Sequence, residues 1–181
     1  MPIKAFGVAK ARLAPVLGPK ERARLGKAVA EHTLGVAGAV GRVAVVTGDA
    51  DVASWALGAG WEVVPERPGL DGAAAAFVDS GAGPWVVLHA DLPLLAVTDL
   101  EAAVAAADLA GWAIAPSSDG GTSLVAGEGP FPFAYGPGSF QRHLAARPGA
   151  AVVVRRGLAV DLDTPADLAA VRNGPEPWDV P

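Results

Sequence analysis

Short apolar runs rich in Val or Trp alternate along this chain with Ala- and Leu-rich stretches of helical length. Gly, Pro or Asp bounds each run, as is usual for strands. The predicted strands are 43–47, 61–64, 85–89, 112–115, 122–126 and 152–155, and the predicted helices are 20–38, 50–58, 72–80, 98–107, 139–146 and 165–172. Strands that are apolar on both faces need cover on both sides. The pattern therefore predicts an α/β fold, with a mostly parallel sheet between two layers of helices.

Side chains at three predicted helix starts suit capping positions. Asp49 or Asp51 is expected to cap the helix at 50–58. For this Asp-Ala-Asp triplet we favour the capping role over metal binding. Thr98 and Glu101 have the spacing of a capping box. Thr164 precedes a proline, which suits the first position of the last helix.

The size and composition of the chain predict one globular domain. Its 181 residues are 51% apolar, and Gly and Pro together stay below the share that marks low complexity. We expect the domain to span residues 1–172, with 173–181 as a tail or an arm packed through Trp178. The absence of cysteine excludes disulfides, a thiolate nucleophile and a zinc ribbon. No apolar run is long enough for a membrane helix and no signal peptide is evident, so a cytoplasmic location without membrane contact is expected.

Positive charge is concentrated at the start of the chain. Residues 1–27 contain seven basic side chains and one acidic one, whereas the whole chain has a net charge of −5. An acidic chain with one basic end does not indicate nucleic-acid binding. It indicates either a local site for a small anion or a solvated basic helix.

Three aspartates are candidate ligands for Mg²⁺. Asp91 follows the apolar run at 85–89, where the carboxyl end of a strand would present it at the sheet edge that binds ligands. Asp161 and Asp163 form an Asp-Leu-Asp triplet, and in extended backbone both carboxylates would point to the same side. Mg²⁺ favours one or two carboxylates together with phosphates and water. Asp91 could instead cap a turn, and Asp163 or Thr164 could cap the last helix.

Lys4, Lys10 and Arg12 place three cations within nine residues, after a very short first strand. Lysine provides a point charge and arginine a bidentate fork, a combination that suits a polyphosphate. A solvated basic surface would have the same composition.

Glycine-rich turns mark two further candidate sites. Thr122 follows Asp-Gly-Gly, and Ser139 follows Gly-Pro-Gly, at a predicted helix start where free N–H groups favour an anion. Their hydroxyls could complete a cradle for a carboxylate or phosphate, or serve ordinary turns. Asp71, within Gly-Leu-Asp-Gly, could accept from the two adjacent donors of guanine, or cap the helix at 72–80.

The motifs of P-loop kinases, dinucleotide-binding Rossmann domains, α/β-hydrolases and zincins are all absent from the sequence. In collinear order, the chain instead resembles the 2-phospho-L-lactate or phosphoenolpyruvate guanylyltransferases of coenzyme F-420 biosynthesis. Gly-Gly-Thr at 120–122 and Gly-Pro-Gly-Ser at 136–139 are the most particular motifs. The other matching segments are 2–4, 9–13, 69–71, 90–95, 142–143 and 161–168.

The resemblance implies a single-domain, Rossmann-like nucleotidyltransferase fold, similar to that of the molybdenum-cofactor guanylyltransferases. It implies GTP, Mg²⁺ and a small phosphorylated acid as ligands, with a homodimer possible. By this resemblance the acid would be bound by Thr122, Gly136 and Ser139, and the base by Asp71. The metal would be held by Asp91 and Asp161. The phosphates would be neutralised by Lys4, Lys10 and Arg12. The alternatives are a related nucleotidyltransferase with a molybdopterin or sugar-phosphate acceptor, and a nucleotide-binding protein without catalysis.

Overall fold

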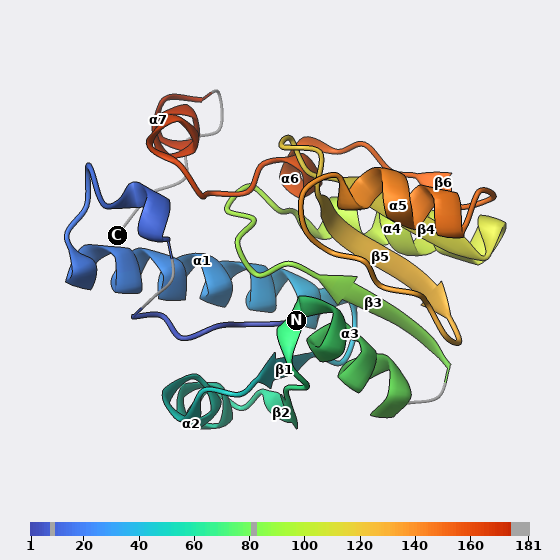
Figure 1. Cartoon of the computed structure of the whole chain (residues 1–181), viewed down its shortest axis with the longest axis horizontal. Coiled ribbons are helices and arrows are strands. Elements are labelled where there is room, and N and C mark those ends of the chain that lie inside the picture. The colour runs from blue at the N-terminus through green and yellow to red at the C-terminus, as the bar shows by residue number, and fades with distance from the viewer. Residues whose placement is uncertain (8–9, 81–82, 175–181) are drawn as a thin grey trace.

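The computed structural model describes residues 1–7, 10–80 and 83–174 of the chain (Figure 1). Six strands lie close to their predicted positions. They are β1 Ala44–Thr47, β2 Glu62–Pro65, β3 Pro84–Leu88, β4 Trp112–Pro116, β5 Thr122–Glu128 and β6 Ala151–Val152. The helices are α1 Pro19–Val40, α2 Ala50–Gly58, α3 Gly69–Ser80, α4 Val97–Ala110, α5 Ser139–Ala146, α6 Arg156–Ala159 and α7 Pro165–Asn173, and Ala11–Leu13 form a 3₁₀ turn.

The strands form a parallel pair, β1 with β2, and a four-stranded sheet in the order β3-β5-β4-β6. β5 is antiparallel to both of its neighbours, and β4 is parallel to β6. Three of the four strands in the larger sheet therefore run in one direction, but only the β4–β6 pair is parallel, which confirms a mixed sheet. Pro2 forms an isolated parallel bridge with Val46, so the first strand is as short as predicted.

Alternating residues of the larger sheet enter two different apolar clusters. Leu124 and Ala126 of β5 pack in a cluster with Leu100 of α4, and Val125 packs in another with Ala74 of α3. Because side chains alternate between the two faces of a strand, helices cover both faces. The predicted three-layer α/β/α arrangement is confirmed.

The helix α1 connects this core to a third cluster near the C-terminal helix. Leu25 and Val29 of α1 pack with Leu168 and Val171 of α7, and Figure 1 shows α7 beside the N-terminal half of α1. Leu162 is fully buried in the same cluster. This packing holds the segment with the Asp-Leu-Asp triplet against the body of the fold.

Several local predictions need correction. Thr98 does not cap α4: the helix begins at Val97, and the carboxylate of Asp99 reaches back to the N–H of Ala96. The strand predicted at 152–155 begins one residue earlier and is shorter: β6 covers only Ala151–Val152, and a short helix that was not predicted, α6, begins at Arg156. Asp49 does cap α2, as predicted, by accepting hydrogen bonds from two backbone N–H groups.

The predicted tail is only partly described, since Trp178 and the rest of 175–181 lie outside the described residues. Among the helices that the structure describes, none has the length and hydropathy needed to cross a bilayer.

Candidate active site

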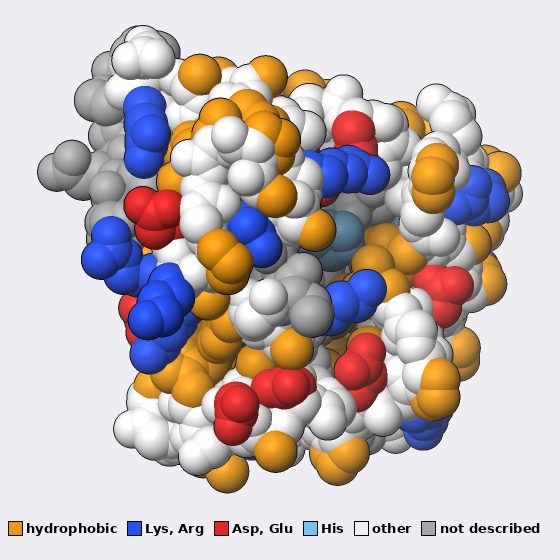
Figure 2. Space-filling model, turned by 60° about the vertical axis from the view of Figure 1, so that its left-hand side comes forward, with side chains coloured by type: hydrophobic (Ala, Val, Ile, Leu, Met, Phe, Trp, Pro, Cys, Tyr) orange, Lys and Arg blue, Asp and Glu red, His pale blue; other side chains and the backbone are white. Residues whose placement is uncertain are grey.

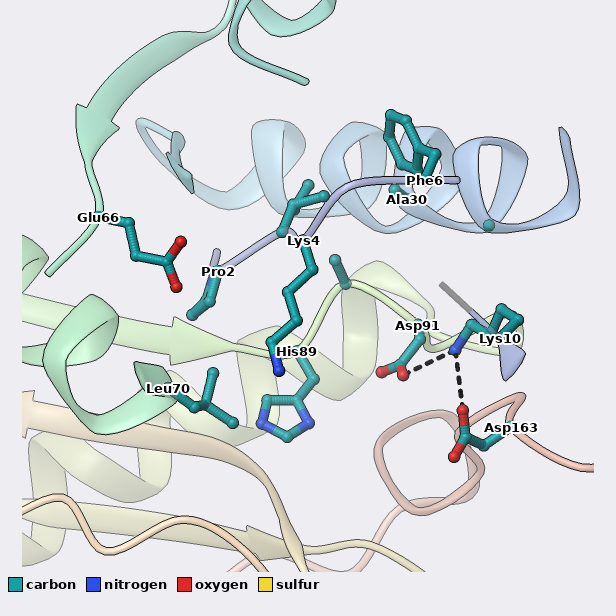
Figure 3. Close-up of a pocket in the computed structure, with 13 residues that line it drawn as sticks. Pro2, Lys4, Phe6, Lys10, Ala30, Glu66, Leu70, His89, Asp91 and Asp163 are labelled. Atoms are coloured by element: carbon teal, nitrogen blue, oxygen red, sulfur yellow. Dashed lines mark hydrogen bonds and ion pairs between the residues drawn. The ribbon is translucent and has the colours of Figure 1, made fainter. Parts of the chain in front are cut away.

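A cavity of about 310 Å³ opens where β2 and β3 end. Glu66 follows β2 and His89 follows β3, and both line it. Figure 3 shows the side chains that surround the cavity, and Figure 2 shows a hollow in one face of the molecule with basic and acidic side chains around it. The other lining residues are Pro2, Ile3, Lys4, Phe6, Lys10, Gly26, Ala30, Leu70, Ala90, Asp91 and Asp163.

Two of the three predicted metal ligands, Asp91 and Asp163, line this cavity, whereas Asp161 does not. Hydrogen bonds connect the segments that carry them. The N–H of Leu162 donates to the carbonyl of Asp91 at 3.0 Å, which places the Asp-Leu-Asp triplet beside the end of β3. The hydroxyl of Thr33, buried on α1, lies 3.4 Å from the carbonyls of Ala90 and Leu92 on either side of Asp91. Asp91, Asp161 and Asp163 therefore come from distant parts of the chain to one edge of the fold.

Lys10 lies between two of these carboxylates (Figure 3). Its Nζ is 2.8 Å from Asp91 Oδ2 and 3.7 Å from Asp163 Oδ1, and only 7% of its side chain is exposed. Arg12 donates to Asp163 Oδ2 at 3.2 Å. Lys10 also has a left-handed backbone with φ of 57°, a conformation that costs free energy for a residue with a side chain. Two of the three predicted phosphate-binding cations, Lys10 and Arg12, are thus held beside the predicted metal ligands.

Lys4 occupies a different place in the cavity. Its side chain extends toward the ring of His89 in Figure 3, away from Asp91. Lys4 and Lys10 therefore line the cavity from two sides, whereas Arg12 is not among the lining residues and its side chain is 71% exposed.

The electrostatic environments of Asp91 and Asp161 differ. Burial by itself would raise the pKa of Asp91, but the Lys10 ammonium and its hydrogen bond outweigh this, so the pKa is lowered and the group stays ionised. Burial, followed by the negative charge of Asp91, raises the pKa of Asp161 to about 6. A cation bound at this edge of the sheet would stabilise the ionised form of Asp161 against both its burial and the negative charge of Asp91.

The residues present fit a Mg²⁺ ion that takes one or two ligands from the protein and the remaining ligands from a phosphate group and water. Within the described part of the chain, no three Asp, Glu, His or Cys side chains are grouped closely enough to hold a metal by themselves. Mg²⁺ does not need such a cage, because it takes one or two carboxylates and completes its shell with phosphates and water. Asp91 Oδ1 is buried without a hydrogen-bond partner among the described residues, as a ligand oxygen awaiting a cation would be.

The last helix is capped by Thr164 and not by Asp163. Thr164 Oγ1 accepts from the N–H of Asp167, and the carboxylate of Asp167 accepts from the N–H groups of Asp163 and Thr164. This capping box leaves the side chain of Asp163 available to Lys10, Arg12 or a metal. The alternative in which Asp163 serves only as a cap is wrong.

The two predicted hydroxyls of the acid-binding site meet beneath the glycine turn. Ser139 Oγ donates to Thr122 Oγ1 at 3.2 Å, and His143 Nδ1 lies 2.9 Å from the same oxygen. His143 Nε2 accepts from the backbone N–H of Ala134, so Nδ1 carries the proton and donates to Thr122. Burial lowers the pKa of His143 to about 4, which keeps this ring neutral. The hydroxyl proton of Thr122 is left for a further acceptor.

Gly136 and Gly138 form the turn above these hydroxyls. Both have positive φ, 110° and 70°, which favours glycine at each position. Thr122 and Ser139 are almost completely buried, and neither they nor Gly136 line the cavity near Asp91. The structure therefore groups the predicted acid-binding residues together, apart from the residues that line the cavity near Asp91.

Asp71 has a different local role from the predicted helix cap. The helix α3 begins at Gly69, so Asp71 lies in its first turn, and its Oδ1 accepts from the backbone N–H of Tyr135 at 2.6 Å. The preceding residue, Leu70, lines the cavity. Asp71 thus connects the helix beside the cavity to the segment that leads into the glycine turn.

His89, Tyr135 and Thr33 belong to this region but were not predicted as site residues. His89 directly follows the buried strand β3, and this position could have indicated a side chain at the ligand-binding edge. Tyr135 and Thr33 offer no such signal, because a single aromatic residue before a turn and a threonine within a helix are common in structural roles.

Known proteins of similar sequence are guanylyltransferases. The family described as "Guanylyl transferase CofC like" matches residues 1–172. A phosphoenolpyruvate guanylyltransferase of Thermomonospora curvata is 40% identical, with the alignment covering 94% of this chain and 80% of that protein. A 3-phospho-D-glycerate guanylyltransferase of Phenylobacterium zucineum is 38% identical over 92% and 85%. A 2-phospho-L-lactate guanylyltransferase of Methanothermobacter thermautotrophicus is 31% identical over 94% and 82%.

A solved structure shares the fold. The putative nucleotide-diphospho-sugar transferase from Desulfovibrio desulfuricans G20 superposes with a TM-score of 0.76, covering 95% of this chain and 84% of that one. Sequence identity is 20%, so this likeness concerns the arrangement of helices and strands alone. It agrees with the nucleotidyltransferase fold that the sequence predicts.

Proposed function

Because this chain belongs to the family of CofC-like guanylyltransferases, we propose that it transfers GMP from GTP to a phosphorylated three-carbon acid and releases pyrophosphate. The product would serve coenzyme F-420 biosynthesis. The observation that best supports this proposal is the group of Asp91, Asp163 and Lys10 at the end of β3, beside a cavity of about 310 Å³. Such an edge of an α/β sheet is where phosphorylated ligands bind.

In this reaction a phosphate oxygen of the acid attacks the α-phosphorus of GTP. A new P–O bond forms, the bond from the α-phosphorus to the bridging oxygen breaks, and pyrophosphate leaves. The attacking phosphate is already ionised at neutral pH, so the protein needs no general base. Its task is to position the two substrates and to neutralise their charge.

Asp91, Asp161 and Asp163 are proposed to hold Mg²⁺. When bound, the ion would offset the charge on the α-phosphate oxygens. Lys10 and Arg12, which pair with Asp91 and Asp163, lie close enough to meet the phosphates of a nucleotide at the same edge. Lys4 approaches from the side of His89 and would contribute a third positive charge.

The acid is proposed to bind at Thr122, Gly136 and Ser139, and the base at Asp71. The spare hydroxyl proton of Thr122 can donate to a carboxylate, and glycine at 136 lets an anion approach the backbone. Asp71 Oδ2 is not engaged by Tyr135, which leaves one carboxylate oxygen for a donor on guanine.

The test is direct. The purified protein is incubated with GTP, Mg²⁺ and one of three acids: phosphoenolpyruvate, 2-phospho-L-lactate or 3-phosphoglycerate. Pyrophosphate release is followed, and the guanylylated acid is identified by mass spectrometry. We expect pyrophosphate and product in equal amounts with at least one acid. The absence of product with all three acids would contradict the proposed function.

A further inference from the structure

Two polar side-chain atoms near the cavity are buried without a partner. In the described part of the chain, neither His89 Nε2 nor Tyr135 Oη has a hydrogen-bond partner. Buried polar atoms are nearly always paired in folded proteins, so two such atoms on neighbouring side chains need an explanation. Neither atom has a role in the reaction described above.

These two side chains lie between the two halves of the proposed site. The rings of His89 and Tyr135 are 5.3 Å apart, and the ring of Tyr135 is 4.9 Å from that of His143. His143 in turn contacts Thr122, and His89 is two residues before Asp91. A three-carbon acid that reaches from the carboxylate edge to Thr122 would therefore pass this pair.

The acids of the relatives differ in the group that would meet the pair. Each carries a phosphate and a carboxylate, for which the proposed site already has partners. Phosphoenolpyruvate has only a methylene group besides these, and 2-phospho-L-lactate has only a methyl group. In contrast, 3-phosphoglycerate has a free hydroxyl. A hydroxyl both donates and accepts, so it can pair with a phenol and an imidazole nitrogen at the same time.

The phenol is suited to donate in such a contact. Burial raises the pKa of Tyr135 far above its ordinary value, so the hydroxyl keeps its proton at any physiological pH. The stacked neighbour Phe133 has no polar atom on its ring, so the hydroxyl of Tyr135 does not pair there.

We propose that His89 and Tyr135 select an acceptor with a free hydroxyl group, a phosphorylated hydroxy acid of the 3-phosphoglycerate kind. This inference rests on the proposed function and specifies its acceptor. A site that hydrogen-bonds a substrate hydroxyl rejects an analogue without it, because the buried polar groups of the protein then stay unpaired.

The unmodified protein provides the first test. With GTP and Mg²⁺ held constant, kcat/KM is measured for 3-phosphoglycerate, phosphoenolpyruvate and 2-phospho-L-lactate. We expect a preference of at least about tenfold for 3-phosphoglycerate. Equal or better use of either of the other acids would overturn the inference while leaving the proposed function in place. If no acid is used at all, the proposed function fails first.

Two pairs of variants test the residues. Tyr135→Phe removes one oxygen and keeps the ring, so kcat/KM for 3-phosphoglycerate should fall about tenfold while that for phosphoenolpyruvate changes little. His89→Leu should act in the same direction, and His89→Gln, which places an amide near the position of Nε2, should restore part of the loss. Thermal unfolding of each variant checks that it is folded. An equal loss for all acids in Tyr135→Phe would show a structural role and overturn the inference.

Discussion

At the scale of single residues, the site depends on charges that are held close together and partly buried. Lys10 contacts both Asp91 and Asp163, so the positive charge between the carboxylates belongs to the protein itself. In the proposed substrate complex, a cation bound by these carboxylates would compete with Lys10, which would then turn to the phosphates of the nucleotide. The same side chains would thus have two sets of partners, one within the protein and one in the complex.

Asp91→Asn is expected to lower turnover by orders of magnitude without unfolding the protein. The substitution keeps the shape of the side chain but removes the charge that would bind Mg²⁺ and that pairs with Lys10. Initial rates are measured over a range of Mg²⁺ concentrations, with Asp108→Asn, an exposed position on α4, as the control. Near-normal, Mg²⁺-dependent rates in Asp91→Asn would mean that Asp91 is not a metal ligand.

Asp71→Ala is expected to weaken the use of GTP and to narrow its advantage over ATP and CTP. A hydrogen bond from the base to the one free oxygen of this charged carboxylate would contribute about 1.5–3 kcal/mol, and the variant would also lose the acceptor for the N–H of Tyr135. Asp71→Asn keeps a carbonyl acceptor and should be milder. Competition among the three nucleotides measures the effect.

Asp51→Ala, which alters the first turn of α2, is the control for this series. If nucleotide selectivity is unchanged in Asp71→Ala, then Asp71 does not read the base, and its role is limited to the contact with Tyr135.

At the scale of elements, β5 depends on a glycine between two tryptophans. Gly127 pairs with Trp85 on one side and with Trp112 on the other, and the two indole rings are 5.7 Å apart. A Cβ atom added at Gly127 would overlap the ring of Trp112. The inner strand β5 therefore has no room for a side chain at this position.

Gly127→Ala is expected to lower the free energy of unfolding by about 1–3 kcal/mol, because overpacking forces side chains or backbone to shift. Gly35→Ala in α1 is the matched control, since nothing lies within 4 Å of the added atom. That variant should stabilise the helix by roughly 0.5–1 kcal/mol. Urea denaturation of both variants gives the two values, and a Gly127→Ala variant as stable as the parent would show that Trp112 relaxes freely.

At the scale of the whole molecule, His143 links the start of β5, the segment before the glycine turn and α5. Its ring is fully buried, and it contacts both Thr122 and the N–H of Ala134. Protonation of the ring would break the bond from Ala134 and bury a charge. The folding equilibrium of the chain is therefore coupled to this proton.

Stability is expected to decrease as pH falls from about 6.5 to about 4. The pKa of His143 is about 4 in the folded protein and 6.5 as its ordinary value, so the unfolded chain binds more protons in this window. The contribution of His143 is complete above pH 6.5 and is lost on acidification; it amounts to roughly 3 kcal/mol. Free energies of unfolding are compared between the parent and His143→Gln, and the variant should show the smaller slope. Identical slopes would contradict the shifted pKa.

The sequence by itself determined the elements and their class. Apolar periodicity and turn residues act within a few residues of each other, so they correctly predicted the principal helices, the strands β1 to β5, and the caps at Asp49 and Thr164. The predicted extent of β6 and the predicted cap at Thr98 were wrong. The rule that ligands bind where parallel strands end selected Asp91, and the spacing of the Asp-Leu-Asp triplet selected Asp161 and Asp163; the fold does bring these segments together.

Only the tertiary structure decided which elements are neighbours and which side chains pair. The pairing of β5 with β3, the insertion of Lys10 between Asp91 and Asp163, and the contact of Asp71 with Tyr135 join residues 36 to 153 positions apart. No local pattern specifies such pairs, because their free energies depend on burial and distance in the folded chain. The sequence likewise could not predict that His89 Nε2 and Tyr135 Oη lack hydrogen-bond partners among the described residues, because this depends on which groups surround the two atoms in the folded chain.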